Sequence, residues 1–335
     1  MTTDHVNADG GGSASEAPSM SVLVTGATGF VGGAVVRALV AAGHQVTALV
    51  RSPERARLLP AGVRPVIGEM SRPETYRDAA AAADVVVHAA QVRVEGRVTR
   101  GRLARLAAAN DTMTTELARV CKEHGRRLVY TSGCFGYGDR AADWITEDTP
   151  LRPTPLGLEH ATQVARLRSM HAEEGLDVVI LHLGFVYGPG GTFKNVFYDQ
   201  ARRGRLRCIG DGANYWSLVH VDDAASAYVA AVERAPAGAE YNVVDDEPLT
   251  LRAFVDELTL ALGKRRPGNV PRALASLAVG APAIASLTSS YRVSNNRIRA
   301  QLGWRPRHQK VSSGLPAVVT QLRRPAARQE NVKAA

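Results

Sequence analysis

Three glycines near the start of the chain have the spacing of a phosphate-binding loop. Gly26, Gly29 and Gly32 follow an apolar run at 21–25 and lead into a helical pattern at 31–42. In such a loop the first glycine permits a tight turn, the second lets backbone N–H groups approach a pyrophosphate, and the third lets the helix pack close to the strand. The segment therefore predicts a dinucleotide-binding turn, and a purely structural glycine turn is the alternative.

The residue after the second predicted strand distinguishes between two dinucleotides. NAD-binding proteins usually have an acidic residue there, which binds the ribose hydroxyls. This chain has Arg51 followed by Ser52, and Arg55 lies close behind. A guanidinium can pair with the 2′-phosphate of NADP(H). We therefore expect NADP(H) as the preferred cofactor and NAD(H) as the alternative, and a merely solvated Arg51 is the competing interpretation.

Residue types that bind metals or form disulfides occur without a recognisable pattern. The three cysteines are widely spaced and form no Cys-x-x-Cys pair, so we expect no disulfide framework and no zinc site. His220, Asp222 and Asp223 are of the metal-ligand type, but their spacing fits no standard site. We expect no metal and a structural role for this segment.

The candidate site residues are far apart in the sequence, so strands and helices must bring them together at one edge of a β-sheet. Apolar runs predict strands at 21–25, 45–50, 63–67, 84–89, 127–131 and 177–181, and helical periodicity predicts helices at 31–42, 76–83, 103–124 and 161–174. Strands that alternate with helices and are apolar on both faces indicate a parallel sheet covered on both sides. The expected fold class is α/β, a Rossmann-type doubly wound parallel sheet with a smaller C-terminal substrate-binding lobe. Ligands then bind outside the carboxyl ends of the strands.

The regular alternation fades after Gly184, and this divides the chain. Residues 1–19 are rich in Gly, Ser and Ala without a signal-peptide pattern, so we expect a disordered leader. The NADP-binding Rossmann domain is expected at 20–187 and about 219–250, and the substrate-binding lobe at 188–218 and 251–311. The weakly patterned segment 312–335 is expected to be a flexible tail.

Charge and hydropathy exclude some classes of partner. The 335 residues carry a formal net charge of +9, from 41 Lys+Arg against 32 Asp+Glu. The basic residues are scattered and are not interleaved with aromatic residues, so we do not expect nucleic-acid binding. No apolar stretch is long enough to cross a membrane, and three cysteines without a pattern fit a reducing compartment. We expect a cytoplasmic protein that acts on a small molecule.

Several segments resemble, in order, the extended short-chain dehydrogenases/reductases, the NAD-dependent epimerase/dehydratase family. TGATGFVG at 25–32 resembles the family's TGxxGxxG signature, and DVVVHAA at 84–90 resembles its DxVxHxAA strand. Further similar segments are TSG with YG at 131–138, GFVYGPG at 184–190, GDG with HVDD at 210–223 and LGWRP at 302–306. Asn110 falls where the family has a structural Asn. The resemblance spans about residues 20–310 and implies an NAD(P)-dependent oxidoreductase, epimerase or dehydratase, often a homodimer.

The resemblance and the two loops above together assign a set of residues to the cofactor site. These are Gly26, Thr28, Gly29, Phe30, Val31, Gly32, Arg51, Ser52, Ala89, Ala90, Thr131, His160, Gly184 and Val186.

The positions that normally move a proton in this family depart from its pattern. The family uses a Tyr with a Lys four residues later, and here Leu156 and His160 stand in those places. Gly133 stands where many members have a catalytic Ser or Thr, and His182 where they often have Arg. Leu156 cannot transfer a proton, whereas an imidazole can. The candidate catalytic residues are therefore His160, the adjacent Ser132 and Tyr137, although a surface position for His160 and a packing role for Tyr137 are open alternatives.

Three functions remain compatible with these residues. The first is an atypical NADP(H)-dependent oxidoreductase or epimerase that acts on a carbonyl or hydroxyl of a specialised-metabolite or sugar-like substrate without the usual Tyr-Lys pair. The second is a non-redox dehydratase, isomerase or cyclase on the same scaffold. The third is a non-catalytic NADP(H) sensor. We favour the first.

Overall fold

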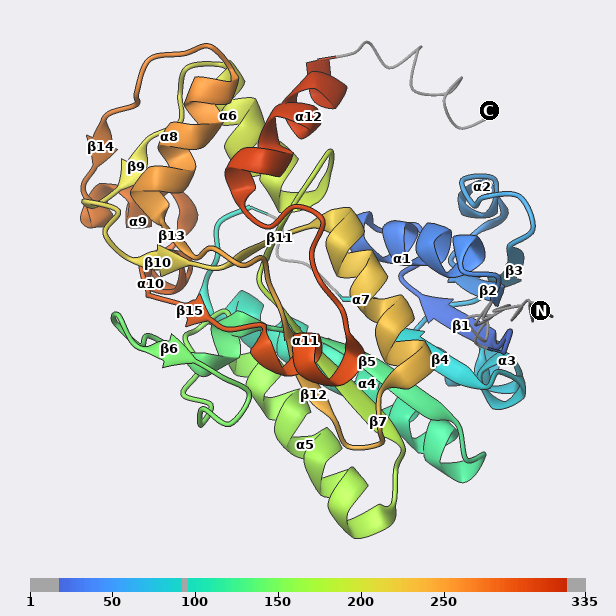
Figure 1. Ribbon diagram of the computed structural model, residues 1–335. Helices are drawn as coiled ribbons and strands as arrows, with labels where there is room; N and C mark the ends of the chain where they lie inside the picture. The colour runs from blue at the N-terminus through green and yellow to red at the C-terminus, as the bar shows by residue number, and fades with distance from the viewer. Residues whose placement is uncertain (1–17, 92–95, 324–335) are drawn as a thin grey trace, which may run out of the picture.

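A seven-stranded parallel sheet forms the centre of the computed structural model, which describes residues 18–91 and 96–323 (Figure 1). The strand order is β12 (Glu240–Val243), β7 (Val178–Leu183), β5 (Arg127–Gly133), β4 (Val85–His88), β1 (Ser21–Thr25), β2 (Gln45–Val50) and β3 (Arg64–Ile67). The chain winds outward in one direction from β1 to β3 and then in the other from β4 to β12. The order therefore reverses between β1 and β4, which is where an open parallel sheet binds its ligand.

Burial on both faces explains why the central strands of the sheet are largely apolar. All four residues of β4 and all six of β7 are buried. One face packs on α1 (Phe30–Ala41), α7 (Val221–Arg234) and α11 (Asn296–Leu302). The other face packs on α3 (Arg77–Ala82), α4 (Arg100–Glu123) and α5 (Leu158–Glu174). The expected α/β class with a doubly wound parallel sheet is confirmed.

Short elements join the sheet to a smaller lobe with its own core. The connecting elements are β6 (Trp144–Ile145), β8 (Phe185–Tyr187), β11 (Leu218–His220) and β15 (Arg292–Val293), whereas α2 (Pro53–Ala56) lies between β2 and β3. The lobe contains α6 (Asp199–Arg202), β9 (Cys208–Ile209), β10 (Tyr215–Trp216), β13 (Leu249–Thr250), α8 (Leu251–Ala261), β14 (Asn269–Val270), α9 (Arg272–Val279) and α10 (Ala281–Leu287). Rings of Phe185, Phe197, Trp216 and Phe254 lie within 5.9 Å of one another, centroid to centroid, and hold this core together.

The expected flexible tail is wrong for residues 312–323. They belong to α12 (Val311–Arg323), which packs against α8 and buries Val311, Leu315, Val318 and Val319. These four residues recur at helical spacing and complete the core of the lobe, which is why the segment is ordered. The remaining tail, 324–335, and most of the expected leader, 1–17, lie outside the described residues.

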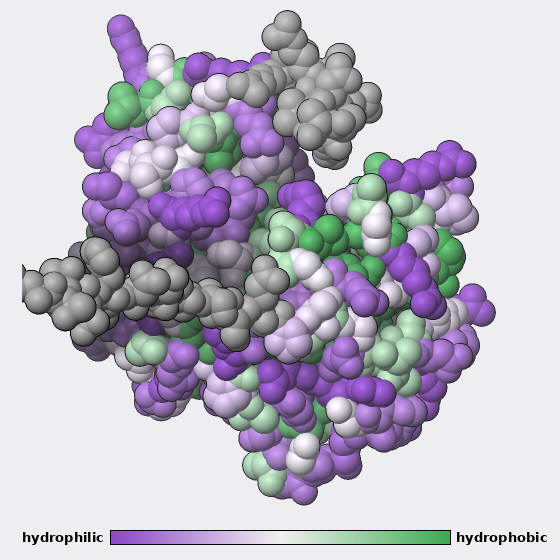
Figure 2. Space-filling view, turned by 45° about the vertical axis from the view of Figure 1, so that its right-hand side comes forward, coloured by the Kyte–Doolittle hydropathy of each residue, from purple (hydrophilic) through white to green (hydrophobic). Residues whose placement is uncertain are grey.

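The surface is mixed in character, and no described helix has the length and apolarity needed to span a bilayer. Figure 2 shows hydrophilic residues over much of one side, with hydrophobic residues gathered in the recess between the lobe and the α1–α2 side of the sheet. The division into domains expected from the sequence remains a prediction.

Candidate active site

In the glycine loop after β1, neighbouring backbone atoms lie so close to Gly26 and Gly32 that a side chain at either position would clash with them. Gly26 has a φ of +70°, and a Cβ there would lie 2.8 Å from the backbone of Ala89 and Ala90. The Gly29 N–H donates to the Gly26 carbonyl over 2.8 Å, which closes the turn. A Cβ on Gly32 would lie 2.2 Å from the same carbonyl oxygen. The three glycines thus serve the turn, the helix start and the close packing of helix on strand.

The N-terminus of α1 is free to receive an anion. Gly29 caps the helix without a side chain, and within the described residues no side chain bonds to this cap and no acidic residue lies in the first turn. The first N–H groups of a 12-residue helix therefore point out of the loop together with the positive end of the helix dipole. Gly29 is exposed, and Thr28, Phe30 and Val31 are half-buried around it. This cradle fits a pyrophosphate.

The end of β2 carries the residue expected to choose the dinucleotide. Arg51 is exposed directly after the strand. Ser52 next to it caps α2, because its Oγ accepts the Arg55 N–H at 3.5 Å. This hydrogen bond fixes the backbone between β2 and α2, and the exposed Arg51 lies at the start of that loop.

Buried hydrogen bonds hold the loop after β4 beside the glycine loop. Thr25 Oγ1 lies 2.8 Å from His88 Nδ1 and accepts the Ala90 N–H at 3.3 Å. Burial lowers the pKa of His88 to about 4, so its ring is neutral at neutral pH. This bonding places Ala89 and Ala90 at the floor of the cradle, as the sequence suggests, through backbone contacts that their small side chains allow.

Three further expected cofactor residues lie in β5, after β7 and in β8. The Thr131 hydroxyl lies 2.6 Å from the Tyr228 hydroxyl inside the core, so only its backbone faces the loop after β4, where its carbonyl accepts from the Gln91 side chain at 3.3 Å. A Cβ on Gly184 would lie 2.6 Å from the Ser217 carbonyl oxygen. Val186 follows in β8 and is half-buried.

The structure places His160 directly above Gly133. Its Nε2 lies 3.3 Å from the position of a Cβ on residue 133, so the imidazole would have to shift by a few tenths of an ångström to admit a side chain there. Its Nδ1 is buried and has no hydrogen-bond partner in the described part of the chain. Burial, and secondly the charge on His182, lower the pKa of His160 to about 4. The ring of His160 is therefore neutral at neutral pH. Its buried Nδ1 also argues against the alternative interpretation from the sequence, in which His160 lies on the surface.

The other residues considered for proton transfer differ in what they offer. Leu156 is half-buried and is held by its N–H, which donates to Ser286 Oγ in α10 at 3.0 Å. Ser132 is buried, and its Oγ has no partner among the described residues. Tyr137 is fully buried, and its hydroxyl donates to Asn242 Oδ1 at 2.8 Å. Tyr137 thus has the packing role named as its alternative.

One acidic group near His160 is not apparent from the sequence. Glu159 lies in the first turn of α5, and its Oε1 is buried without a partner among the described residues. Burial raises its pKa to about 7, although a hydrogen bond with the Asn110 side chain lowers it in part. Glu159 Oε1 is buried because α4 packs on α5. Spacing within one stretch of sequence does not reveal a contact between two helices, so the sequence provides no signal for this group.

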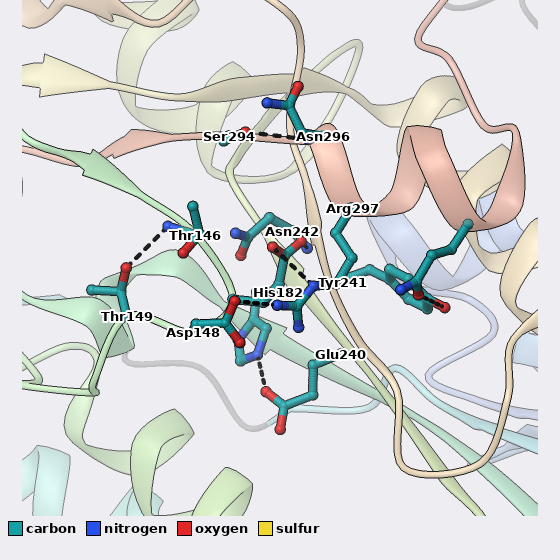
Figure 3. Close-up of polar contacts among 12 residues, drawn as sticks. Thr146, Asp148, Thr149, His182, Glu240, Tyr241, Asn242, Ser294, Asn296 and Arg297 are labelled. Atoms are coloured by element: carbon teal, nitrogen blue, oxygen red, sulfur yellow. Dashed lines mark hydrogen bonds and ion pairs between the residues drawn. The ribbon is translucent and has the colours of Figure 1, made fainter.

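His182 belongs to a charged network at the end of the sheet. Figure 3 shows His182 from β7 turned toward Glu240 from β12, and its Nε2 lies 2.8 Å from Glu240 Oε2. Arg168 from α5 donates to the same carboxylate at 2.8 Å. The network therefore links α5 to the edge strand β12 and to its neighbour β7. Tyr137 packs on it, with its ring centroid 5.3 Å from that of His182.

The histidine–aspartate segment near the start of α7 secures the C-terminal part of the chain. His220, Asp223 and His308 come within 4.8 Å of one another, whereas Asp222 is exposed. The Asp223 carboxylate accepts the backbone N–H groups of Arg307 and His308 at 2.8 and 3.0 Å and lies 2.8 Å from His308 Nδ1. Its oxygens are thus already bonded, in agreement with a structural role.

A doubly wound sheet with an uncapped glycine-rich helix start at its switch point defines a dinucleotide-binding protein of the Rossmann type. The model of the NAD dependent epimerase/dehydratase family matches residues 22–244, and the chain belongs to that family. It is therefore an enzyme of the NAD(P)-dependent oxidoreductase, epimerase or dehydratase type, as the resemblance implies.

Three similar proteins illustrate the range of the family. A 3-diazoavenalumate denitrifying reductase from a Streptomyces species is 34% identical over 307 residues, which is 88% of this chain and 99% of that protein. A 2-alkyl-3-oxoalkanoate reductase from Stenotrophomonas maltophilia is 34% identical over 264 residues, covering 74% and 77% of the two chains. The crystal structure of the Thermus thermophilus UDP-glucose 4-epimerase in complex with NAD superposes with a TM-score of 0.76 at 25% identity, covering 91% of this chain and 99% of that one.

Proposed function

We propose that the chain is an NAD(P)H-dependent reductase of a small molecule that works without a Tyr-Lys pair. The observation that carries this proposal is an intact dinucleotide cradle next to Gly133, Leu156 and a neutral His160. When bound, a reduced nicotinamide supplies a hydride. The glycine loop and the start of α1 hold the pyrophosphate, and the loops after β4, β5 and β7 orient the substrate beside the ring.

We infer that NADP(H) is preferred to NAD(H). Arg51 is exposed at the end of β2 and no acidic residue stands beside it in the loop 51–53. Replacing Arg51 with Ala should weaken NADPH binding by about 10- to 100-fold, because a charge-assisted hydrogen bond to the 2′-phosphate is lost. NADH binding should change by less than about twofold. Calorimetric titration measures both.

The control for this prediction is Arg57→Ala, which removes an exposed guanidinium at the end of the same short helix. It should leave both affinities unchanged. Equal losses of NADPH and NADH binding in Arg51→Ala would contradict the preference.

The named relatives suggest two classes of substrate. The Streptomyces relative is a denitrifying reductase of a diazo compound, and the Stenotrophomonas relative reduces a 3-oxoalkanoate. A diazo substrate is favoured by the absence of the ordinary proton donors. A carbonyl substrate requires another proton donor, and His160 and Ser132 are the candidates for it, since their buried polar atoms have no partner in the described structure.

The test is NADPH oxidation by the purified protein in the presence of aryl diazonium salts and, separately, 3-oxo esters. We expect oxidation with one of the two classes and one mole of reduced product for each mole of NADPH consumed. Consumption of a substrate without NADPH oxidation would instead support the non-redox alternative. Tight NADPH binding with no turnover of either class would support the sensor. A cytoplasmic location and a homodimer remain our expectations.

A further inference from the structure

We propose that a cavity in the smaller lobe binds a compact anion with two or more phosphate groups. The cavity has a volume of about 490 Å³ and lies where the chain leaves α6 and α8 and runs toward β9 and β14. Figure 1 shows these four elements together in the lobe, well apart from α1. The site is therefore distinct from the dinucleotide cradle, and the inference goes beyond the proposed reductase function without resting on it.

The same local layout occurs twice beside this cavity. The helices α6 and α8 are each followed by a glycine with a left-handed φ, which is +69° at Gly204 and +70° at Gly263. The chain then continues through Arg-Leu-Arg at 205–207 into β9, and through Lys-Arg-Arg at 264–266 toward β14. Because β9 and β14 pair in parallel, the two basic segments come to the same side of the lobe, although they are distant in the sequence.

The lining of the cavity is positively charged, and its surroundings offset only part of that charge. It contains Arg207, Lys264, Arg265 and Arg266, all exposed, and no acidic or aromatic residue. Arg207 donates to two carbonyl groups of its own loop at 2.8 and 3.1 Å, and Arg266 lies 3.0 Å from Asp256 Oδ2. The side chains of Lys264 and Arg265 have no hydrogen bond or ion pair within the described residues. At least these two cations are thus available to a ligand.

A role at the helix ends explains only part of this charge. The carboxyl end of a helix favours a nearby cation, and Arg207 meets that need with its two bonds to carbonyl groups. The segments 202–207 and 264–268 nevertheless hold seven basic residues and no acidic one, in a chain whose formal net charge is +9. Like charges this close repel one another, and an anion bound between them relieves the repulsion. The arrangement therefore favours an anion site over a merely solvated face.

The types of cation and the size of the cavity specify the anion. Arginine binds phosphate oxygens through two parallel N–H groups, and lysine adds a compact point charge. Even after the pairing of Arg266 with Asp256, the positive charge of the lining exceeds the negative charge of one phosphate group. The lining residues include no aromatic ring on which a nucleic-acid base could stack. A cavity of this volume suits a small ligand with several phosphates.

A calorimetric titration with inorganic triphosphate tests the proposal. The protein is saturated with NADP⁺, so that the glycine loop is occupied, and the buffer contains no divalent cation. We expect triphosphate to bind at least about tenfold more tightly than inorganic phosphate. The double variant Lys264→Gln with Arg265→Gln should weaken triphosphate binding at least about tenfold, because two cations of the lining are lost. Both side chains are exposed, so the fold should not change.

The matched control is the double variant Arg305→Gln with Arg307→Gln, which removes two exposed positive charges outside the cavity. It should leave triphosphate binding within about twofold of the unaltered protein. Equal losses of binding in the two double variants would reduce the effect to net charge and refute the site. Equal affinity of the unaltered protein for phosphate and triphosphate would also overturn the proposal.

Two further ligands identify the source of the phosphates. Equal binding of ATP and triphosphate would support recognition of the phosphate groups alone, and much tighter binding of ATP would support a nucleotide as the ligand. Tighter binding of an oligoglutamate peptide than of triphosphate would mean that the cavity belongs to a docking surface for an acidic protein, and the proposal would be wrong. Failure to bind NADP⁺ would refute the reductase function, whereas this inference depends only on the effect of the double variant at Lys264 and Arg265.

Discussion

At the scale of single residues, the inferred difference between this site and that of an ordinary family member is which side chains can donate or accept a proton. From the resemblance to the family we infer that Leu156 and His160 stand in the places of a Tyr and a Lys. The sequence does not show that the His160 ring is desolvated, or that a carboxylate oxygen of Glu159 is buried, because both depend on packing between segments distant in the chain. Residue types at a site are thus predictable from a motif, whereas their protonation states require the packed structure.

Restoring the missing pair provides a test at this scale. The double variant Leu156→Tyr with His160→Lys should raise kcat/KM for a 3-oxo ester by about 100-fold or more, because a tyrosine activated by a nearby ammonium can protonate the alkoxide. Initial rates of NADPH oxidation measure the effect. The control is Leu156→Phe with His160→Lys, which has the ring without the hydroxyl. Equal rates in the two double variants would rule out a missing proton donor as the reason for low carbonyl activity.

Among the elements, those between Gly26 and Gly175 follow the sequence most closely. Most of their strands are apolar on both faces, and Gly43, Gly125 and Gly175 end helices with a positive φ, so local patterns predict them. The last helix, α12, is the exception. Gly314 and Pro316 lie within it and weaken the local helix signal. A Cβ on Gly314 would lie 2.3 Å from the Tyr187 hydroxyl, so tertiary packing requires what local propensity disfavours.

The stability of the lobe should depend on α12. Leu315 is 1% exposed within the core of the lobe, and Leu315→Ala should lower the free energy of unfolding by about 2–5 kcal/mol through lost burial and a residual cavity. Ala317→Ser, at an exposed position on the same helix, should change it by less than about 0.5 kcal/mol. Urea denaturation measures both. A change in Leu315→Ala as small as in the control would mean that the helix is not part of the cooperative core.

For the whole molecule, the network of His182, Glu240 and Arg168 connects β7 and the edge strand β12 with α5. Burial alone would raise the pKa of Glu240, but hydrogen bonds from His182 and Arg168 outweigh it and hold the pKa at about 2. A carboxyl group whose pKa is lower in the folded than in the unfolded protein stabilises the fold at pH values above its ordinary pKa. The contribution is lost as the pH falls from about 5 toward 2.

Glu240→Gln should therefore lower the free energy of unfolding by about 3 kcal/mol at pH 7, because His182 and Arg168 lose a charged hydrogen-bond acceptor. The difference from the unaltered protein should shrink as the pH falls below about 5. Urea denaturation at a series of pH values measures it. Glu74→Gln is the control, since that carboxylate is 68% exposed and its pair with Arg72 should contribute little. A constant difference from pH 7 to 3 would show that the ionised carboxylate is not what stabilises the sheet edge.

The close approach of His160 to Gly133 also couples the residue types that these two positions can hold. A Cβ at 133 would lie 3.3 Å from His160 Nε2, so the imidazole would have to shift by a few tenths of an ångström to admit a side chain there. The effect of a substitution at 133 should therefore depend on which side chain stands at 160, although the two positions lie 27 residues apart in the chain.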